Sequence, residues 1–392
     1  MKRVRNWAAC ALTVTLLAAC GGGDPKVPGT GEPAGAPTSR GTFTALVSFG
    51  DSLSDLGAYA PATSFAGDGS APYLGGKFTT NGASGTVWVE NVAAALGLVV
   101  TPAEVGFGPV SVKCPAAAVS PALAATCTAY GQGGSRVTDP NGIGKSGGAL
   151  TVPMAQQVAN HLERFGSFTA NDLVVVFGGN NDVFVQAGTL AFKAAMLTGD
   201  SSTTAEQKSA LLLQAQLEGQ AEMKKAALEL SALVRDQILA KGAKYVAVWN
   251  LPDSGLTPYG LSIGAQGQAT LGVMVDTFNL WLREGLTGLP VRVVDANAGF
   301  KDVWNNPARY GITQNQIPAC DATKIAAVTG GVITDGSSLF CNATAGVPFN
   351  TLRDGADVNT WQFADGVHPT TGGHKLIADD ALKALRSFGW IQ

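Results

Sequence analysis

The sequence predicts an α/β protein, a three-layer α/β/α sandwich around a mostly parallel sheet. Short apolar segments rich in β-branched residues alternate with longer segments of helical periodicity from about Thr42 onward. This alternation is typical of parallel strands joined by helices that cover both faces of the sheet. Of the 392 residues, 46% are hydrophobic and 50 are glycine, which is enough for a sizeable core with many turns.

The predicted elements follow one another in a regular order. Strands are expected at 45–49, 172–179, 244–251 and 291–296. Helices are expected at 86–98, 205–242, 276–286 and 371–389, the second of them long and amphipathic. Parallel sheets bind ligands beyond the carboxyl ends of their strands, so residues that follow a strand directly are candidate site residues.

The charge pattern argues against a polyanion as ligand. The formal net charge is −3, only 14% of the residues are charged, and no block of basic residues occurs. A nucleic-acid partner is therefore not expected. The length fits one large domain or two ordinary ones, and the unbroken strand–helix pattern favours a single domain over 42–392.

The amino-terminal residues have the composition of an export signal. Three cations within the first five residues precede an apolar run, 7–19, that is too short to span a bilayer comfortably. The run ends in Leu17-Ala18-Ala19-Cys20, which resembles the lipobox of bacterial lipoproteins; an ordinary signal peptide with a chance cysteine is the alternative. Residues 1–19 are accordingly expected to be a lipoprotein signal peptide, with Cys20 carrying the lipid.

A tether is expected to follow the signal. Residues 20–41 are rich in Gly, Pro, Ala and Thr and have no apolar period, which predicts disorder. The chain is thus expected to be exported and held by a lipid anchor at the bacterial outer membrane or cell surface, with a secreted or periplasmic protein as the alternative.

The cysteines agree with export. Six occur, and Cys10 and Cys20 belong to the targeting segment. In an oxidising compartment the other four predict the disulfides Cys114–Cys127 and Cys320–Cys341, although other pairings stay open. A zinc site is not expected, because no cysteine lies near another Cys or a His at ligand spacing. The surrounding segments are rich in Ala, Gly and Thr and predict irregular insertions near the strand ends.

Gly50-Asp51-Ser52 follows the first predicted strand directly. Ser52 would cap the next helix in an ordinary strand–turn–helix connection. As a nucleophile it would need a base, an orienting acid and an oxyanion site, since a serine hydroxyl is otherwise weakly reactive.

Three histidines are candidates for the base. His161 lies in a helical segment and is expected at the surface or its boundary, and His374 lies early in the last helix, where polar residues are ordinary. His368 is followed by a proline, which disfavours helix and places it on a loop. Asp365, three residues earlier, is able to bind Nδ1 and leave Nε2 free to take a proton; a plain loop is the alternative.

Two glycine-rich blocks contain suitable oxyanion donors. They are Tyr130–Arg136, "YGQGGSR", and Gly178–Asp182, "GGNND". Backbone N–H groups in such turns and an asparagine amide both stabilise developing negative charge. Each block alone would also fit an ordinary turn.

The four blocks together, in this order, resemble the GDSL, or SGNH, family of lipases and esterases. The resemblance covers nearly everything after Phe43, with weaker echoes in "FTTNGASGTVWVE" (78–90) and "NLPDSGLTP" (250–258). It implies the flavodoxin-like form of the sandwich and the hydrolysis of a carboxylic ester through an acyl-serine, without a cofactor or metal. The substrate would be a small-molecule, lipid or polymeric ester.

The resemblance also implies residue roles. Ser52 would be the nucleophile, His368 the base and Asp365 its orienting acid. The oxyanion donors would be the Ser52 N–H, the Gly134 N–H, for which Gly133 is the other candidate, and the Asn181 amide. The chain departs from the family at Ala58, where an asparagine is frequent, which leaves the local loop contacts open.

Three alternatives remain. The same residues would serve an acyltransferase, and the scaffold would serve a non-catalytic binding lipoprotein. Gly260–Gly264, "GLSIG", also matches a nucleophile elbow, with Ser262, Asp295 and His368 in the matching order. An elbow needs a strand directly before its serine, however, and the preceding "PDSGLTPY" predicts turn and loop.

Overall fold

The computed structural model describes residues 43–63, 76–345 and 350–392. The predicted signal peptide (1–19), Cys20 and the predicted tether (20–41) lie outside these residues. Within them, the main sheet has the strand order β1-β4-β5-β6, and every pair is parallel. Its strands are β1 (Ala45–Gly50), β4 (Asp172–Phe177), β5 (Tyr245–Trp249) and β6 (Arg292–Val294). The predicted parallel sheet is confirmed, and each strand lies where the sequence places it.

A further segment pairs with the outer edge of β1. The Ser48 N–H donates to the Thr128 carbonyl (2.9 Å), and the Tyr130 N–H donates to the Ser48 carbonyl (2.8 Å), which makes a parallel bridge between Ser48 and Ala129. Counted as the second strand, this segment gives the order 2-1-3-4-5, which is the flavodoxin-like arrangement. The "YGQGGSR" block therefore starts next to the strand that leads into Ser52.

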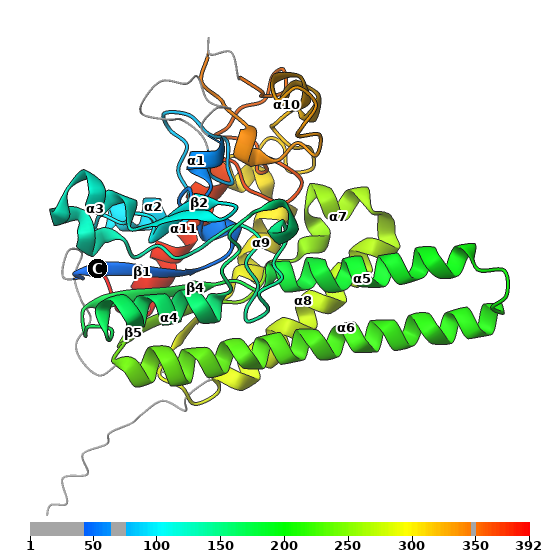
Figure 1. The fold of residues 1–392 in the computed structure, drawn as a ribbon, viewed down its shortest axis with the longest axis horizontal. Helices are drawn as coiled ribbons and strands as arrows, with labels where there is room; N and C mark the ends of the chain where they lie inside the picture. Colours follow the sequence, from blue (N-terminus) through cyan, green and yellow to red (C-terminus); the bar gives the residue numbers. More distant parts are fainter. Residues whose placement is uncertain (1–42, 64–75, 346–349) are drawn as a thin grey trace, which may run out of the picture.

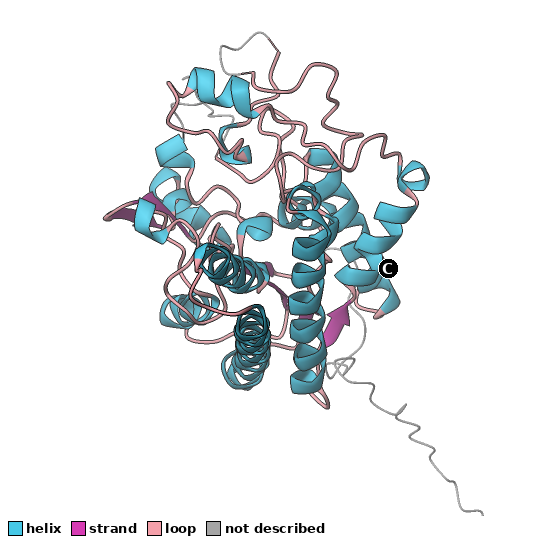
Figure 2. Ribbon diagram, turned by 90° about the vertical axis from the view of Figure 1, so that its right-hand side faces the viewer, coloured by secondary structure: helices cyan, strands magenta, loops and turns pink. Residues whose placement is uncertain are grey.

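Helices cover both faces of the sheet (Figure 1). α2 (Trp88–Ala95) packs with α11 (Thr371–Ser387) on one face. On the other lie α4 (Met154–Phe165), α5 (Asn180–Gly199), α6 (Ala205–Leu233) and α8 (Gly264–Leu286). Together α5 and α6 form a long hairpin that projects from the sandwich and is seen nearly end-on in Figure 2. Among the described helices, none has both the length and the apolar character that crossing a bilayer requires.

Several elements differ from the prediction. α5 was not expected, because its apolar residues are spread around the helix and it begins within a block that predicts a turn; Phe192 and Met196 are exposed on it. α8 starts twelve residues earlier than expected, and α6 ends in a π-helical turn, Val234–Ile238. The first cysteine insertion, expected to be irregular, contains an antiparallel hairpin of β2 (Glu104–Phe107) and β3 (Val110–Lys113).

The remaining helices lie near the carboxyl edge of the sheet or in the insertions: α1 (Ala60–Thr63), α3 (Pro115–Val119), α7 (Pro258–Ser262), α9 (Ala296–Asn305) and α10 (Ala322–Val328). Both predicted disulfides are present. Cys114–Cys127 encloses α3, and Cys320–Cys341 encloses α10. Cys127 directly precedes the Thr128–Tyr130 segment, so this insertion joins the sheet at the amino end of that segment rather than at a carboxyl end.

The expectation that His161 lies at the surface is wrong. Its side chain is on the buried face of α4 and stacks on Phe168, with ring centroids 4.3 Å apart. Phe49 and Tyr130 pack against it edge-on. Burial lowers the pKa of His161 to about 4, so the imidazole is neutral in the folded protein near pH 7.

His161 should therefore make the protein acid-sensitive. Because its folded pKa is below the unfolded value of about 6.5, unfolding takes up a proton between pH 6.5 and 4, and the stability it contributes is lost as pH falls through that range. The substitution His161→Phe removes this pH-dependent contribution to the free energy of unfolding. The free energy of unfolding of the variant relative to wild type should rise by up to about 1.4 kcal/mol for each pH unit of acidification. Urea unfolding at pH 7 and pH 5 measures the difference, and a difference that is independent of pH would contradict the assignment.

Candidate active site

Ser52 is presented by an abrupt end of β1. The strand ends at Gly50, where a Cβ would lie 2.3 Å from the Phe177 carbonyl, so only glycine fits between the two strands. Asp51 then caps a 3₁₀ turn, Ser52–Ser54, by accepting the Leu53 N–H (3.1 Å). Ser52 is consequently the first residue of a turn, directly beyond the carboxyl end of the strand.

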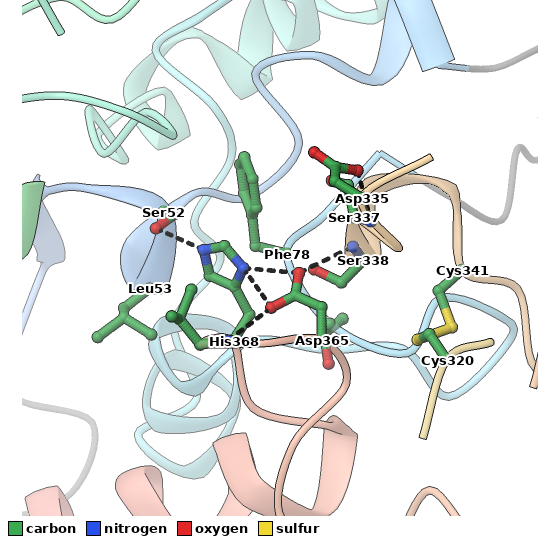
Figure 3. Close-up of polar contacts among 12 residues, drawn as sticks. Ser52, Leu53, Phe78, Cys320, Asp335, Ser337, Ser338, Cys341, Asp365 and His368 are labelled. Atoms are coloured by element: carbon green, nitrogen blue, oxygen red, sulfur yellow. Dashed lines mark hydrogen bonds and ion pairs between the residues drawn. A yellow bond between two sulfur atoms is a disulfide. The ribbon is translucent and has the colours of Figure 1, made fainter. Parts of the chain in front are cut away.

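His368 lies between Ser52 and Asp365 (Figure 3). Its Nε2 is 2.9 Å from the Ser52 hydroxyl, and its Nδ1 is 2.9 and 2.8 Å from the two carboxylate oxygens of Asp365. A carboxylate only accepts, so Nδ1 carries the proton and Nε2 is left to accept from the serine. The structure thus brings together the three residues that the sequence analysis singled out, across 316 residues of chain.

Asp365 is held in its ionised form. Burial by itself raises the pKa of this carboxyl, but the electrostatic interaction and hydrogen bond with His368, together with the amide donors, outweigh burial and hold the pKa well below its usual range. Oδ1 accepts the N–H groups of Val367 (3.0 Å) and His368 (2.8 Å), and Oδ2 accepts the Ser338 N–H (2.8 Å). An ionised acid therefore faces Nδ1 at neutral pH.

Phe78 packs against the imidazole ring of His368, with the two ring centroids 4.6 Å apart. His374 in turn holds the Phe78 segment: its Nε2–H donates to the Phe78 carbonyl (3.1 Å), and its Nδ1 accepts the Trp88 N–H (3.3 Å). Burial lowers the pKa of His374 to about 3, so the ring stays neutral. His374 is thus a buried structural residue, which its early position in a helix did not reveal.

The two candidate glycines differ in their hydrogen bonds. The Gly133 N–H donates to Asp55 Oδ2 (2.8 Å) and is therefore occupied. Gly134 has a φ of +81°, and in the described part of the chain its N–H has no acceptor. The Ser52 N–H is likewise without an acceptor there. These contacts favour Gly134 over Gly133 as a donor to a bound oxyanion.

Asn181 lies in the first turn of α5, just beyond the carboxyl end of β4. Gly179 begins this turn with a φ of +119°, where a Cβ would lie 2.5 Å from the Phe278 ring. One N–H of the Asn181 amide donates to the Ser135 carbonyl (2.8 Å), so the second remains for a ligand. Asn180 donates to Asp51 Oδ2 (3.0 Å) and ties this turn to the one that carries Ser52.

Two further buried aspartates, which sequence reasoning missed, hold the loops of the site. Asp55 accepts the N–H groups of Gly57, Ala58 and Gly133. Burial raises the pKa of Asp55 to about 6 although these donors oppose it. At Ala58, the position where the chain departs from the family, the backbone N–H is one of these three donors.

The second of these aspartates is Asp182, which closes the "GGNND" block. It accepts Arg136 Nε (2.9 Å) and the Val137 N–H (3.1 Å). The bond to Arg136 fixes the end of "YGQGGSR" against α5. Asp182 directly follows Asn181 and Asp55 lies three residues after Ser52, and this closeness to candidate site residues is the signal by which the sequence could have revealed them.

The nucleophile-elbow alternative is not supported. Ser262 ends α7 instead of following a strand, and its hydroxyl donates to the Tyr259 carbonyl (2.7 Å). Asp295 accepts from Asn250 (2.7 Å) and from the Ala298 N–H, not from His368. Within the described ranges, no group of three or more His, Cys, Asp or Glu side chains is arranged to hold a metal ion.

A largely apolar groove of about 290 Å³ lies near Ser52 and His368, although neither residue lines it. Their chain neighbours Leu53, Val367 and Pro369 line it, and it continues along α11 as far as Lys383. Its other apolar walls come from the ends of β4 and β5 and from α9: Phe177, Trp249, Phe300 and Val303. The groove is a suitable place for an apolar group attached to a carbonyl at Ser52.

Comparison with known proteins agrees with this geometry. A model of the GDSL-like lipase/acylhydrolase family matches residues 46–381, from β1 to within α11. The chain belongs to this family. The match spans all of the family motifs described above, from the Gly50-Asp51-Ser52 block to the Asp365–His368 loop.

Two curated relatives are both called esterase EstA, one from Pseudomonas aeruginosa and one from Pseudomonas putida. Each is 32% identical over 147 residues, which is 36% of this chain and 20% of the relative. The match thus spans about a fifth of the length of these relatives. A crystal structure of a member of the lipolytic protein G-D-S-L family from Veillonella parvula DSM 2008 is 15% identical, with a TM-score of 0.35 over 86% of this chain and 96% of that one. That superposition is too weak to support an inference.

Proposed function

We propose that the protein hydrolyses carboxylic esters through an acyl-serine intermediate. The observation that carries the proposal is the continuous line from the Ser52 hydroxyl through His368 to the ionised Asp365, with contacts of 2.9 and 2.8 Å. The free N–H groups of Ser52 and Gly134 and the second amide N–H of Asn181 support it, because acyl transfer needs donors where negative charge develops. Family membership supports the same reaction class.

The reaction follows from these roles. His368 Nε2 takes the Ser52 proton as Oγ attacks the carbonyl carbon, and Asp365 stabilises the imidazolium. The three N–H donors bind the oxyanion of the tetrahedral intermediate. As the intermediate collapses, His368 gives its proton to the leaving alkoxide, and the acyl group stays on Ser52. Water, deprotonated by His368, then attacks the acyl-serine, and the carboxylic acid leaves as His368 returns the proton to Ser52 Oγ.

The groove suggests the type of ester. Its apolar lining favours a substrate with an apolar acyl or alcohol group, and its length along α11 leaves room for an extended chain. The natural ester belongs to a small molecule, a lipid or a polymer whose reacting end reaches Ser52.

Replacement of Ser52 tests the nucleophile. Ser52→Ala should lower the rate by about 10⁴-fold or more, because no other group in the site is positioned to form the acyl intermediate. Wild type and variant should be compared on esters of increasing acyl length, with product analysis to separate hydrolysis from transfer to a second alcohol. A serine-directed phosphonate should label Ser52. Label on Ser262 with Ser52 unmodified would refute the assignment, and absence of both turnover and label would favour a binding protein.

Asn181→Ala tests the side-chain donor to the oxyanion. Loss of one such donor should lower kcat by about 10²- to 10³-fold, because the bond strengthens as charge develops on the carbonyl oxygen. Loss of the bond to Ser135 should lower the free energy of unfolding by only about 1 kcal/mol. Asn181→Asp, which keeps the shape without an N–H, should be at least as slow. Near wild-type kcat in both variants would count against this role.

The lipid anchor is proposed from the sequence. Leu17-Ala18-Ala19-Cys20 supplies the lipidation signal, and the Gly/Pro-rich residues after it supply a tether for the domain from about residue 42 onward. A single acyl chain holds a protein only marginally, whereas two or more give stable anchoring. The mature protein is therefore an exported lipoprotein that reaches its ester from a membrane surface.

Cys20→Ser tests the anchor. Wild type should fractionate with membranes, resist extraction by high salt and yield to detergent, because the hold is hydrophobic. The mass of its mature amino terminus should include a diacylglycerol and an added acyl chain. The Cys20→Ser variant should neither fractionate with membranes nor carry the added lipid mass. If both proteins fractionate alike and wild type carries no added mass, the chain is secreted without a lipid; the catalytic assignments would be unaffected.

A further inference from the structure

We propose that the turn containing Ser338 is a positioning element for Asp365, and that the Cys320–Cys341 disulfide fixes this turn. The backbone N–H of Ser338, rather than its hydroxyl, would act through Asp365 on His368. The inference rests on the proposed function, since it assigns a role in orienting the catalytic base.

Ser338 makes a contact of a particular kind. Its N–H donates to Asp365 Oδ2 (2.8 Å), and the same oxygen lies 2.8 Å from His368 Nδ1. The other amide donors to this carboxylate, Val367 and His368, belong to the loop of Asp365 itself and bind Oδ1. Among the described residues, Ser338 is thus the backbone amide donor to Asp365 that comes from outside the 365–368 loop (Figure 3).

The disulfide joins the two segments on either side of this contact. Cys341 closes the turn of Ser338, because its N–H donates to the Ser338 carbonyl (3.1 Å). Cys320 pairs with the residue before Asp365, since its N–H donates to the Ala364 carbonyl (2.9 Å). Cys320, Cys341 and Ala364 also pack together in a small buried cluster. The covalent link therefore sets the distance between the turn that contains Ser338 and the loop segment that carries Asp365.

Asn81 also binds the turn that contains Ser338, through two hydrogen bonds. Its side-chain amide donates to the Ser338 carbonyl (2.8 Å), and its backbone N–H donates to the Cys341 carbonyl (2.9 Å). Three residues before Asn81 lies Phe78, which packs against the His368 ring. The turn is therefore connected to the segment that packs against His368. Displacement of the turn would let the Asp365 carboxylate rotate away from His368 Nδ1.

Two substitutions of Ser338 distinguish the role of its backbone amide from the role of its side chain. Ser338 is the first residue of its 3₁₀ turn, and Ser337 before it is extended (φ −49°, ψ 129°). The backbone at this position accepts proline, so Ser338→Pro removes the N–H, and its ring Cδ takes the place of the amide proton and displaces Asp365 Oδ2. Ser338→Ala keeps the N–H and loses only a buried hydroxyl that has no partner.

Two readouts test the proposal. Ser338→Pro should lower kcat by about 10-fold with little change in KM, and the acid limb of the kcat/KM profile should move to lower pH, because the imidazolium loses support. Ser338→Ala should retain wild-type kinetics. Independently of any substrate, the downfield Nδ1 proton resonance of His368 should shift or broaden in the proline variant and persist in the alanine variant. Identical kinetics and resonances in both variants would overturn the proposal.

Removal of each disulfide in turn tests whether Cys320–Cys341 fixes the turn of Ser338, with Cys114–Cys127 as the control. Cys320→Ser/Cys341→Ser should alter the His368 resonance and lower kcat, whereas Cys114→Ser/Cys127→Ser, which opens a loop outside the site, should destabilise the fold without either effect. Equal behaviour of the two double variants at a temperature where both are folded would overturn the role of Cys320–Cys341. Because the resonance needs no ester, an inactive wild-type enzyme would refute the proposed function and leave this inference testable.

Discussion

The site depends on one buried, ionised carboxylate. Asp365 accepts three backbone N–H groups and the Nδ1–H of His368, and these contacts keep it charged although burial opposes the charge. A buried charge without such partners would be neutralised. Its charge and orientation set the tautomer of His368, and the tautomer in turn leaves Nε2 as the acceptor for Ser52.

The sheet brings the remaining parts to the same edge. β1 ends at the turn of Ser52, the Thr128–Tyr130 segment leads to Gly134, and β4 leads to Asn181. Because these are three neighbouring positions in a parallel sheet, their carboxyl ends meet. Buried side chains then lock the three turns to one another, through Asp51 with Asn180, Asp55 with Gly133, and Asp182 with Arg136.

The strands of the main sheet, the helices α2, α6, α8 and α11 and the candidate site residues could be predicted from the sequence, because their signals are local. Residues 173–177 are continuously apolar, and His368 has its acid three residues away and a proline next to it. α5 has no such signal, since its partners α6 and α8 stabilise it rather than an apolar stripe of its own. His161 stands at helical spacing from Met154 and Val158, so the apolar face of α4 is a local signal for its burial. The contact of Ser338 with Asp365, by contrast, arises only from tertiary packing.

The most direct test of this account is a crystal structure of the protein after reaction with an alkyl phosphonate. The account predicts phosphorus bonded to Ser52 Oγ, with the phosphonyl oxygen about 3 Å from the backbone nitrogens of Ser52 and Gly134 and from Asn181 Nδ2. His368 should keep its contact with Asp365, and the alkyl chain should enter the groove beside Leu53. Phosphorus on another residue, or a phosphonyl oxygen that faces none of these three donors, would contradict it.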